Sequence, residues 1–192
     1  SDNSSGTSAT GTNAVAMGKN TEAIGTASTA MGISTTASGS YSTAMGSDTT
    51  ASGSRSTAMG RGTTASGSYS TAMGYGTTAS GSSSTAMGRS TTASGSSSTA
   101  MGSDTTASDY ASLVIGQYNS SGSSATSADS FSTSNTAFVI GNGADSSNKS
   151  DAFKVMFNGD TTVSNDLTVS GDVVISSDAI LNSNIVSLGS TL

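Results

Sequence analysis

The chain has 192 residues and a formal net charge of −6, with 32% hydrophobic and only 9% charged residues. It contains no cysteine and no histidine, which excludes disulfide cross-links, thiolate metal sites and the commonest general base. Its six basic residues are scattered and outnumbered by acidic ones, so nucleic acid is not an expected partner, and no apolar run approaches the roughly 20 residues of a membrane span.

An internal repeat follows an irregular lead-in (residues 1–12) and extends over residues 13–116. The segment Ser-Thr-Ala-Met-Gly (42–46) alternates with the weaker Thr-Ala-Ser-Gly (36–39), and each returns every fourteen residues. A fixed period predicts stacked coils rather than a globular core. Glycine followed by variable small residues indicates turns, so each coil is expected to hold two short strands joined by two turns.

Alternation within these strands separates two faces. Ala30 and Ala37 are expected to fill the thin interior of the coil, whereas Thr29 and Met31 share the outer face. A helix is the alternative because Ala and Met favour helices, but two glycines per fourteen residues argue against it. With coils stacked about 4.7–4.9 Å apart, the repeat predicts a rod on the order of 35 Å long.

The outer faces of the stronger strands carry apolar side chains that a single chain cannot bury. An alanine interior contributes little against an ordering cost of about 1.5 kcal/mol per residue, and each methionine contributes roughly 1.5–3 kcal/mol only if it is buried. An exposed apolar stripe marks an interface between copies, so we predict an obligate oligomer. The predicted interface consists of Met17, Met31, Met45, Met59, Met73, Met87, Met101 and Ile115.

The turns carry the candidate contact residues for a receptor. Residues fourteen apart stack, which predicts either a cation–π ladder that stiffens the turns or a surface that binds sugar or protein. We favour the stiffening ladder. The residues are Tyr41, Arg55 and Tyr69 at one turn, and Arg61, Tyr75 and Arg89 at the opposite turn.

The fourteen-residue alternation of Ala-Met-Gly (44–46) and Ala-Ser-Gly (37–39) resembles the YadA-type head repeat of trimeric autotransporter adhesins. The inner strand of that family has the form Ser-Val-Ala-Ile-Gly, and residues 42–46 match it with Thr and Met in place of Val and Ile. The segment Ala-Ser-Leu-Val-Ile-Gly (111–116) is closer still. The resemblance covers about half of the chain and implies a left-handed parallel β-roll that assembles as a trimer.

Ice binding is a competing hypothesis for the repeat. A flat array of regularly spaced hydroxyl groups could order water, but the methionines oppose this hypothesis because a monomeric ice binder has no use for them. The threonines of the array are Thr36, Thr50, Thr64, Thr78, Thr92 and Thr106, beside serines from Ser38 to Ser108.

Beyond Gly116 the period breaks. Residues 117–141 are predicted to form an enlarged coil with an insertion, and residues 142–165 a hairpin neck, because alternating apolar residues precede an Asn-Gly turn at 158–159. Residues 166–192 continue a period of six and resemble the triple-stranded β shafts of bacteriophage tail fibres and tailspikes. The regularly spaced aspartates are interpreted as turn residues rather than calcium ligands.

The end of the chain resembles the start of the intramolecular chaperone of endosialidase-type phage proteins, which is peptidase S74-like. The family motif Ser-Asp-x-Arg-Leu-Lys-x-x-Ile aligns with residues 177–185, with Ile180 and Asn182 in place of Arg and Lys. The resemblance implies self-cleavage just before Ser177. The matching positions are Ser177, Asp178, Leu181 and Ile185.

Together these features predict an all-β structural and adhesive segment of an extracellular trimeric fibre, with no enzymatic site apart from Ser177, no cofactor and no metal. The expected partners are further copies of the chain and a cell-surface carbohydrate or protein receptor. A bacteriophage tail fibre is the first hypothesis because of the chaperone-like end. A bacterial trimeric surface adhesin is the alternative, and an ice-binding or surface-structuring solenoid is the second alternative. The chain is expected to be a piece of a longer protein.

Overall fold

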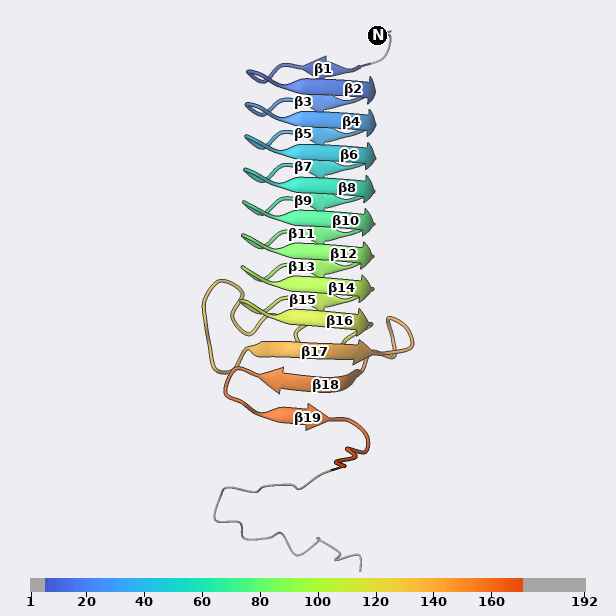
Figure 1. Ribbon diagram of the computed structural model, residues 1–192, viewed down its shortest axis with the longest axis vertical. Coiled ribbons are helices and arrows are strands. Elements are labelled where there is room, and N and C mark those ends of the chain that lie inside the picture. The colour runs from blue at the N-terminus through green and yellow to red at the C-terminus, as the bar shows by residue number, and fades with distance from the viewer. Residues whose placement is uncertain (1–5, 171–192) are drawn as a thin grey trace, which may run out of the picture.

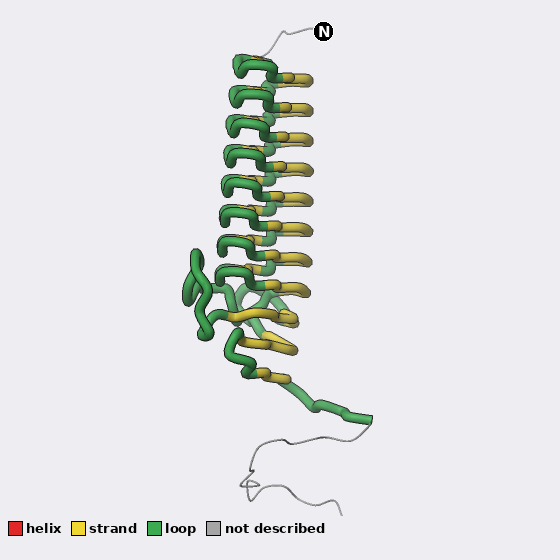
Figure 2. The backbone as a smooth tube through the Cα atoms, turned by 60° about the vertical axis from the view of Figure 1, so that its left-hand side comes forward, coloured by secondary structure: helices red, strands yellow, loops and turns green. Residues whose placement is uncertain are grey.

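The computed structural model describes residues 6–170, which form a rod of stacked β-coils (Figure 1). Each coil contributes one strand to each of two parallel sheets, and Figure 2 shows the regular stack from the side. The first sheet contains the two-residue strands β1 (Ser8–Ala9), β3 (Glu22–Ala23), β5 (Thr36–Ala37), β7 (Thr50–Ala51), β9 (Thr64–Ala65), β11 (Thr78–Ala79), β13 (Thr92–Ala93) and β15 (Thr106–Ala107).

The second sheet is larger because it extends beyond the repeat. Its five-residue strands are β2 (Val15–Lys19), β4 (Thr29–Ile33), β6 (Thr43–Ser47), β8 (Thr57–Arg61), β10 (Thr71–Tyr75), β12 (Thr85–Arg89), β14 (Thr99–Ser103) and β16 (Leu113–Gln117). Three more strands complete it, namely β17 (Thr136–Asn142), β18 (Asp151–Met156) and β19 (Thr161–Val163).

The register between strands confirms the fourteen-residue coil. Met73 lies opposite Met59 on one side and Met87 on the other, and Thr78 lies opposite Thr64 in the short sheet. The expected all-β solenoid is therefore confirmed for the repeat. The helical alternative is wrong, since residues 6–170 contain strands and turns but no helix.

The interior of the rod is a column of small side chains. Ala30 and Ala37, from the two strands of one coil, are both fully buried, as alternation predicted. Each full coil also buries one serine and one threonine, such as Ser42 and Thr35, which precede the two strands. These hydroxyl groups were not predicted to lie inside. Most of them have no hydrogen-bond partner within the described residues.

The two glycines of each coil have different structural roles. Gly39 opens a turn that is closed by the Ser42 amide donating to the Gly39 carbonyl oxygen at 3.2 Å. Gly32 was also predicted to mark a turn, but it lies inside β4 with φ of 124°. A Cβ atom there would lie 1.9 Å from the carbonyl oxygen of Gly46. Gly32 is therefore required by the close approach of neighbouring coils.

Two buried polar side chains anchor the insertion after β16. Asp109 occupies the position that is glycine in the preceding coils, and its carboxylate accepts hydrogen bonds from the amides of Thr126 at 2.6 Å and Thr136 at 2.8 Å. The Asn119 side chain bonds both the amide and the carbonyl of Thr106, each at 2.8 Å. Asn119 therefore substitutes for the next strand of the short sheet, which ends at β15.

The last strands extend the larger sheet at the base of the rod (Figure 1). β17 pairs parallel with β16, whereas β18 pairs antiparallel with β17 and β19 antiparallel with β18. Residues 164–170 form no strand, and Leu167 is 71% exposed. A triple-stranded shaft needs strands from partner chains, so the shaft from residue 166 stays a prediction. The motif at Ser177 lies outside the described residues.

Candidate functional site

The outer surface of the larger sheet is the first candidate site, and we call it the apolar face. Parallel in-register pairing stacks the predicted interface residues into one continuous row along the rod. The row begins at Met17, which is 58% exposed, and its later members are partly exposed. Its members are Met17, Met31, Met45, Met59, Met73, Met87, Met101 and Ile115.

The apolar face widens at the base of the rod. Ile115 lies opposite Ile140 of β17, and Ile140 lies opposite Phe153 of β18. The rings of Phe138 and Phe153 approach to 6.0 Å between centroids. Side chains on the same face of neighbouring strands pack against one another, so these aromatic residues continue the methionine row. The structure brings the row and the aromatic cluster together as one surface.

The turn that begins at Gly39 and the equivalent turns of the next coils carry a ladder of stacked tyrosine and arginine side chains. The Arg55 guanidinium lies 5.2 Å from the centroid of the Tyr41 ring and 5.3 Å from that of Tyr69, and it donates to the Tyr69 hydroxyl at 3.2 Å. Both tyrosines are 57% exposed. All three residues have positive φ, but so does Ser83 at the equivalent position. The backbone strain therefore belongs to the turn and does not single out these residues.

The opposite edge of the larger sheet carries the second set of predicted contact residues. Arg61 lies over the Tyr75 ring at 5.6 Å, as stacking predicted. Arg89 instead forms an ion pair with Asp104 at 3.0 Å and donates to the Ser103 hydroxyl. An exposed pair of this kind contributes about 1 kcal/mol at most. The two edges are separate surfaces, because one belongs to the turns and the other to the strand ends.

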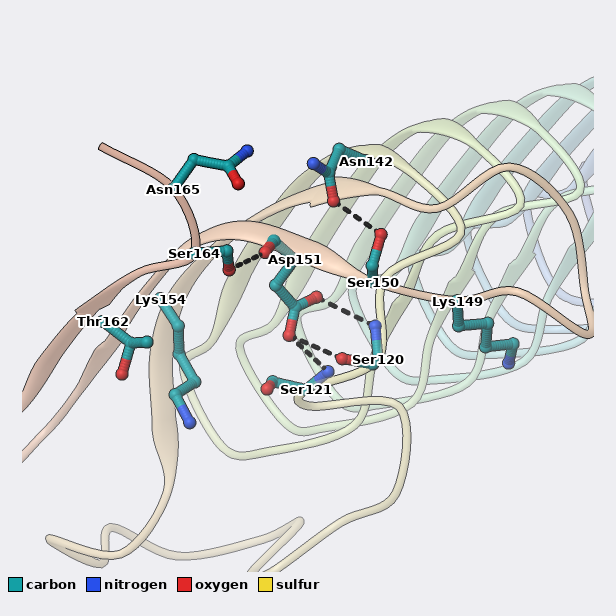
Figure 3. Close-up of a pocket in the computed structure, with 10 residues that line it drawn as sticks. All are labelled: Ser120, Ser121, Asn142, Lys149, Ser150, Asp151, Lys154, Thr162, Ser164 and Asn165. Carbon is teal, nitrogen blue, oxygen red and sulfur yellow. Dashed lines mark hydrogen bonds between the residues drawn. The ribbon is translucent and has the colours of Figure 1, made fainter. Parts of the chain in front are cut away.

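A polar hollow of about 460 Å³ lies at the base of the rod (Figure 3). This hollow was not predicted from the sequence, because its residues come from segments some 30 positions apart and follow no period. A weak signal existed in Lys154, a charged residue that lies between the alternating apolar residues Phe153 and Val155 of β18. The hollow is lined by Ser120, Ser121, Asn142, Lys149, Ser150, Asp151, Lys154, Thr162, Ser164 and Asn165.

The hollow and the apolar face lie on opposite sides of β18. Phe153 and Val155 lie opposite Ile140 and Phe138, on the apolar face. Lys154 lies between them and opposite Val139, whose side chain is fully buried on the inner side of the sheet. Because successive side chains of a strand alternate between faces, Lys154 points toward the inner side.

Asp151 is the central charged group of the hollow. Burial raises its pKa, but hydrogen bonds from Ser120 and Ser121 outweigh burial and hold the pKa below its ordinary value. The amides of Ser120 and Ser121 and the Ser120 hydroxyl each donate to this carboxylate at 2.8 Å. Asp151 therefore remains ionised and holds the start of the insertion against β18.

Asp145, on the loop between β17 and β18, is another carboxylate with a shifted pKa. Hydrogen bonds from the Asn148 side chain, and then from the amides of Ser147 and Asn148, lower its pKa. Within residues 6–170 no three His, Cys, Asp or Glu side chains converge as metal ligands. The same part of the chain has no helix long and apolar enough to cross a membrane.

Comparison with known protein families identifies the repeat. The model of the YadA head domain repeat matches residues 5–21, 9–35, 23–49, 37–63, 51–77, 65–91, 79–105 and 93–119. No curated protein matches the chain. The family matches do not extend to residues 120–192, so the resemblances to phage shafts and to the phage chaperone stay predictions. Because the matches cover more than half of the sequence in overlapping copies, the chain belongs to the YadA head domain repeat family.

Proposed function

We propose that the chain is the rod of an extracellular trimeric fibre that attaches to a cell surface. The observation that supports this proposal is the apolar face, a row of partly exposed methionines that runs the length of the repeat and ends in an aromatic cluster. Contiguous apolar surface of this extent is typical of an interface rather than of a monomer.

The energetics of the coil support assembly. The interior consists of alanine, serine and threonine, so each coil buries little apolar area on its own. Fully burying a methionine side chain contributes roughly 1.5–3 kcal/mol. The side chains of the row are partly exposed in the single chain, so burying the rest of their surface between chains would contribute part of that free energy. One straight apolar face per rod suits a cyclic assembly around a central axis. The YadA-type head, to which the repeats belong, implies three copies.

In such a trimer the tyrosines and arginines of the turns would lie away from the axis, where a carbohydrate or protein receptor could reach them. The YadA head repeats support a structural and adhesive role for this rod. The family match favours a bacterial surface adhesin as the carrier of this rod. The motif at 177–185 favours a bacteriophage tail fibre, which would use the same rod for host attachment.

Measuring the mass in solution by light scattering tests the assembly. We expect three 18.5-kDa chains per particle at micromolar concentration. Met59→Lys should dissociate the particle, because it places a charge in the middle of the apolar face. Thr64→Lys is the matched control, since it places the same charge on the outer face of the short sheet in the same coil. A monomeric wild-type chain would refute the proposal.

The ice-binding alternative is tested separately. The threonines of the short sheet stack in register, as in Thr64 opposite Thr78, so the array that this hypothesis needs is present. The adhesive hypothesis predicts no thermal hysteresis in a trimeric sample. Measurable hysteresis that Thr64→Lys abolishes would favour ice binding instead.

A further inference from the structure

The hollow at the base exists because the two sheets end at different places. The short sheet stops at β15, whereas the larger sheet continues through β17, β18 and β19. The inner side of these last strands therefore loses the cover that the short sheet gives to every coil above. The insertion supplies only a partial wall through Ser120 and Ser121, and an open polar hollow remains (Figure 3).

The hollow gathers positive charge on a chain that is otherwise acidic. Two of the six basic residues of the chain, Lys149 and Lys154, line it, although the net charge is −6. In Figure 3 the two lysines lie on either side of Asp151 and its serine partners. Neither lysine forms an ion pair with any of residues 6–170. Both ammonium groups are therefore available to a ligand that carries negative charge.

Asp151 restricts which anion fits. A carboxylate offers about four acceptor positions, and three are filled by the amides of Ser120 and Ser121 and by the Ser120 hydroxyl. The carboxylate remains negatively charged, so it repels a simple anion but can accept a hydrogen bond from a hydroxyl group. A ligand that carries a negative group for a lysine and a hydroxyl group for Asp151 fits this arrangement. The rest of the lining is polar, with Ser121, Thr162 and Asn165 among its members.

We propose that this hollow binds a carboxylated monosaccharide, such as a uronic acid unit of a surface polysaccharide. The sugar carboxylate pairs with Lys154, and a ring hydroxyl donates to Asp151. A volume of about 460 Å³ accommodates a sugar ring, since sites that enclose larger ligands span roughly 300–1,000 Å³. The inference rests on the adhesive function proposed above and names its ligand class.

Isothermal titration of the full chain with methyl glucuronide tests the site, with methyl glucoside as the neutral counterpart. We expect saturable binding of the glucuronide and at least about tenfold weaker binding of the glucoside, because a charge-assisted hydrogen bond is lost. Lys154→Gln should weaken glucuronide binding to the same extent, whereas Lys154→Arg should retain it within about threefold. Lys19→Gln is the matched control, because it removes the same charge at the far end of the rod.

Several results would overturn the inference. They are no glucuronide binding, equal binding of glucuronide and inorganic phosphate, or an equal loss in Lys19→Gln and Lys154→Gln. The last two results would show that the chain attracts anions non-specifically and that the hollow is not a specific binding site. The mass measurement separates this failure from failure of the proposed function. A trimer that binds no glucuronide removes the ligand assignment alone, and a monomer removes the fibre.

Discussion

Two buried serines in neighbouring coils form a natural matched pair. Ser70 and Ser84 occupy the same position of the repeat, and both side chains are fully buried. The Ser84 hydroxyl donates to the Gly81 carbonyl oxygen at 2.7 Å. The Ser70 hydroxyl has no hydrogen-bond partner in the described part of the chain. Replacing each by alanine therefore removes the same atom from two different bonding states.

The expected effects have opposite signs. Ser84→Ala loses a neutral hydrogen bond, which contributes about 0.5–1.5 kcal/mol net to the free energy of unfolding. Ser70→Ala removes a hydroxyl whose unpaired burial costs about 1–3 kcal/mol. The free energies of unfolding of the two variants should therefore differ by about 2–4 kcal/mol, with Ser70→Ala the more stable.

Thermal unfolding followed by circular dichroism measures this difference. For a chain of 150–250 residues 1 kcal/mol shifts the midpoint by about 2–4 °C, so we expect Ser70→Ala to melt about 5 °C or more above Ser84→Ala. The wild-type midpoint should lie between them. Assembly does not affect the comparison, because both positions face the interior of the coil. Equal shifts in the two variants would refute the reasoning by showing that the two hydroxyls have the same energetic environment.

Three further predictions follow from the glycines, the hollow and the turn ladder. Gly60→Ala should lower the free energy of unfolding in urea by about 3 kcal/mol or more, because a Cβ atom there would lie 2.0 Å from a carbonyl oxygen of the next coil. Gly62→Ala should lower it by only about 1 kcal/mol, because the nearest neighbours of a Cβ atom there lie at 4.0 Å. Because the folded pKa of Asp151 is lowered, its stabilisation is present above the ordinary value of 3.8 and lost as pH falls through the lowered pKa. The protection factor of the Ser121 amide, which corrects for the slower intrinsic exchange at low pH, should fall across that window, and at neutral pH it should be lower in Asp151→Asn than in the wild-type chain. Arg55→Ala should lower the thermal midpoint by about 2–8 °C, since its two exposed cation–π contacts contribute about 0.5–1 kcal/mol each.

The solenoid could be predicted from the sequence because its long-range contacts repeat a local pattern. Once the period is fourteen, each strand pairs with its own next copy, and the register needs no further information. Alternation then predicts that Ala72 is buried and that Met73 is outside, as the structure shows.

Alternation extends one residue beyond the start of each short strand. Thr35 and Thr36 are adjacent and identical in type, yet Thr35 is fully buried and Thr36 is partly exposed. The preceding residue, Ser34, has φ of 53°, which reorients the chain between the two strands. Because residues two apart share a face, Thr35 lies on the side of the buried Ala37 and Thr36 on the opposite side, so the pattern that places Ala37 inside also places Thr35 inside.

The hollow, in contrast, could not be predicted from the sequence. Its central contacts join Asp151 to Ser120 and Ser121, about 30 residues earlier, across a segment without a period. Such contacts depend on the path of the insertion, which no local pattern specifies. A signal does exist in the repeat, since position 109 is aspartate where seven preceding coils have glycine. A charged residue at a buried, tightly packed position indicates that a new partner replaces the next coil.

The end of the repeat and the candidate binding site have a common physical origin. An open sheet edge presents unpaired amides and carbonyls, and Asn119 closes the edge of the short sheet by bonding both backbone groups of Thr106. Asp109 holds the insertion beside this closed edge, so another short strand cannot add. The larger sheet has no such block and continues to β19. The uncovered inner side of β18, with Lys154 and Asp151, follows from closing one sheet while the other extends. The loss of the period is therefore the step that converts a uniform rod into a rod with a distinct polar site at its base.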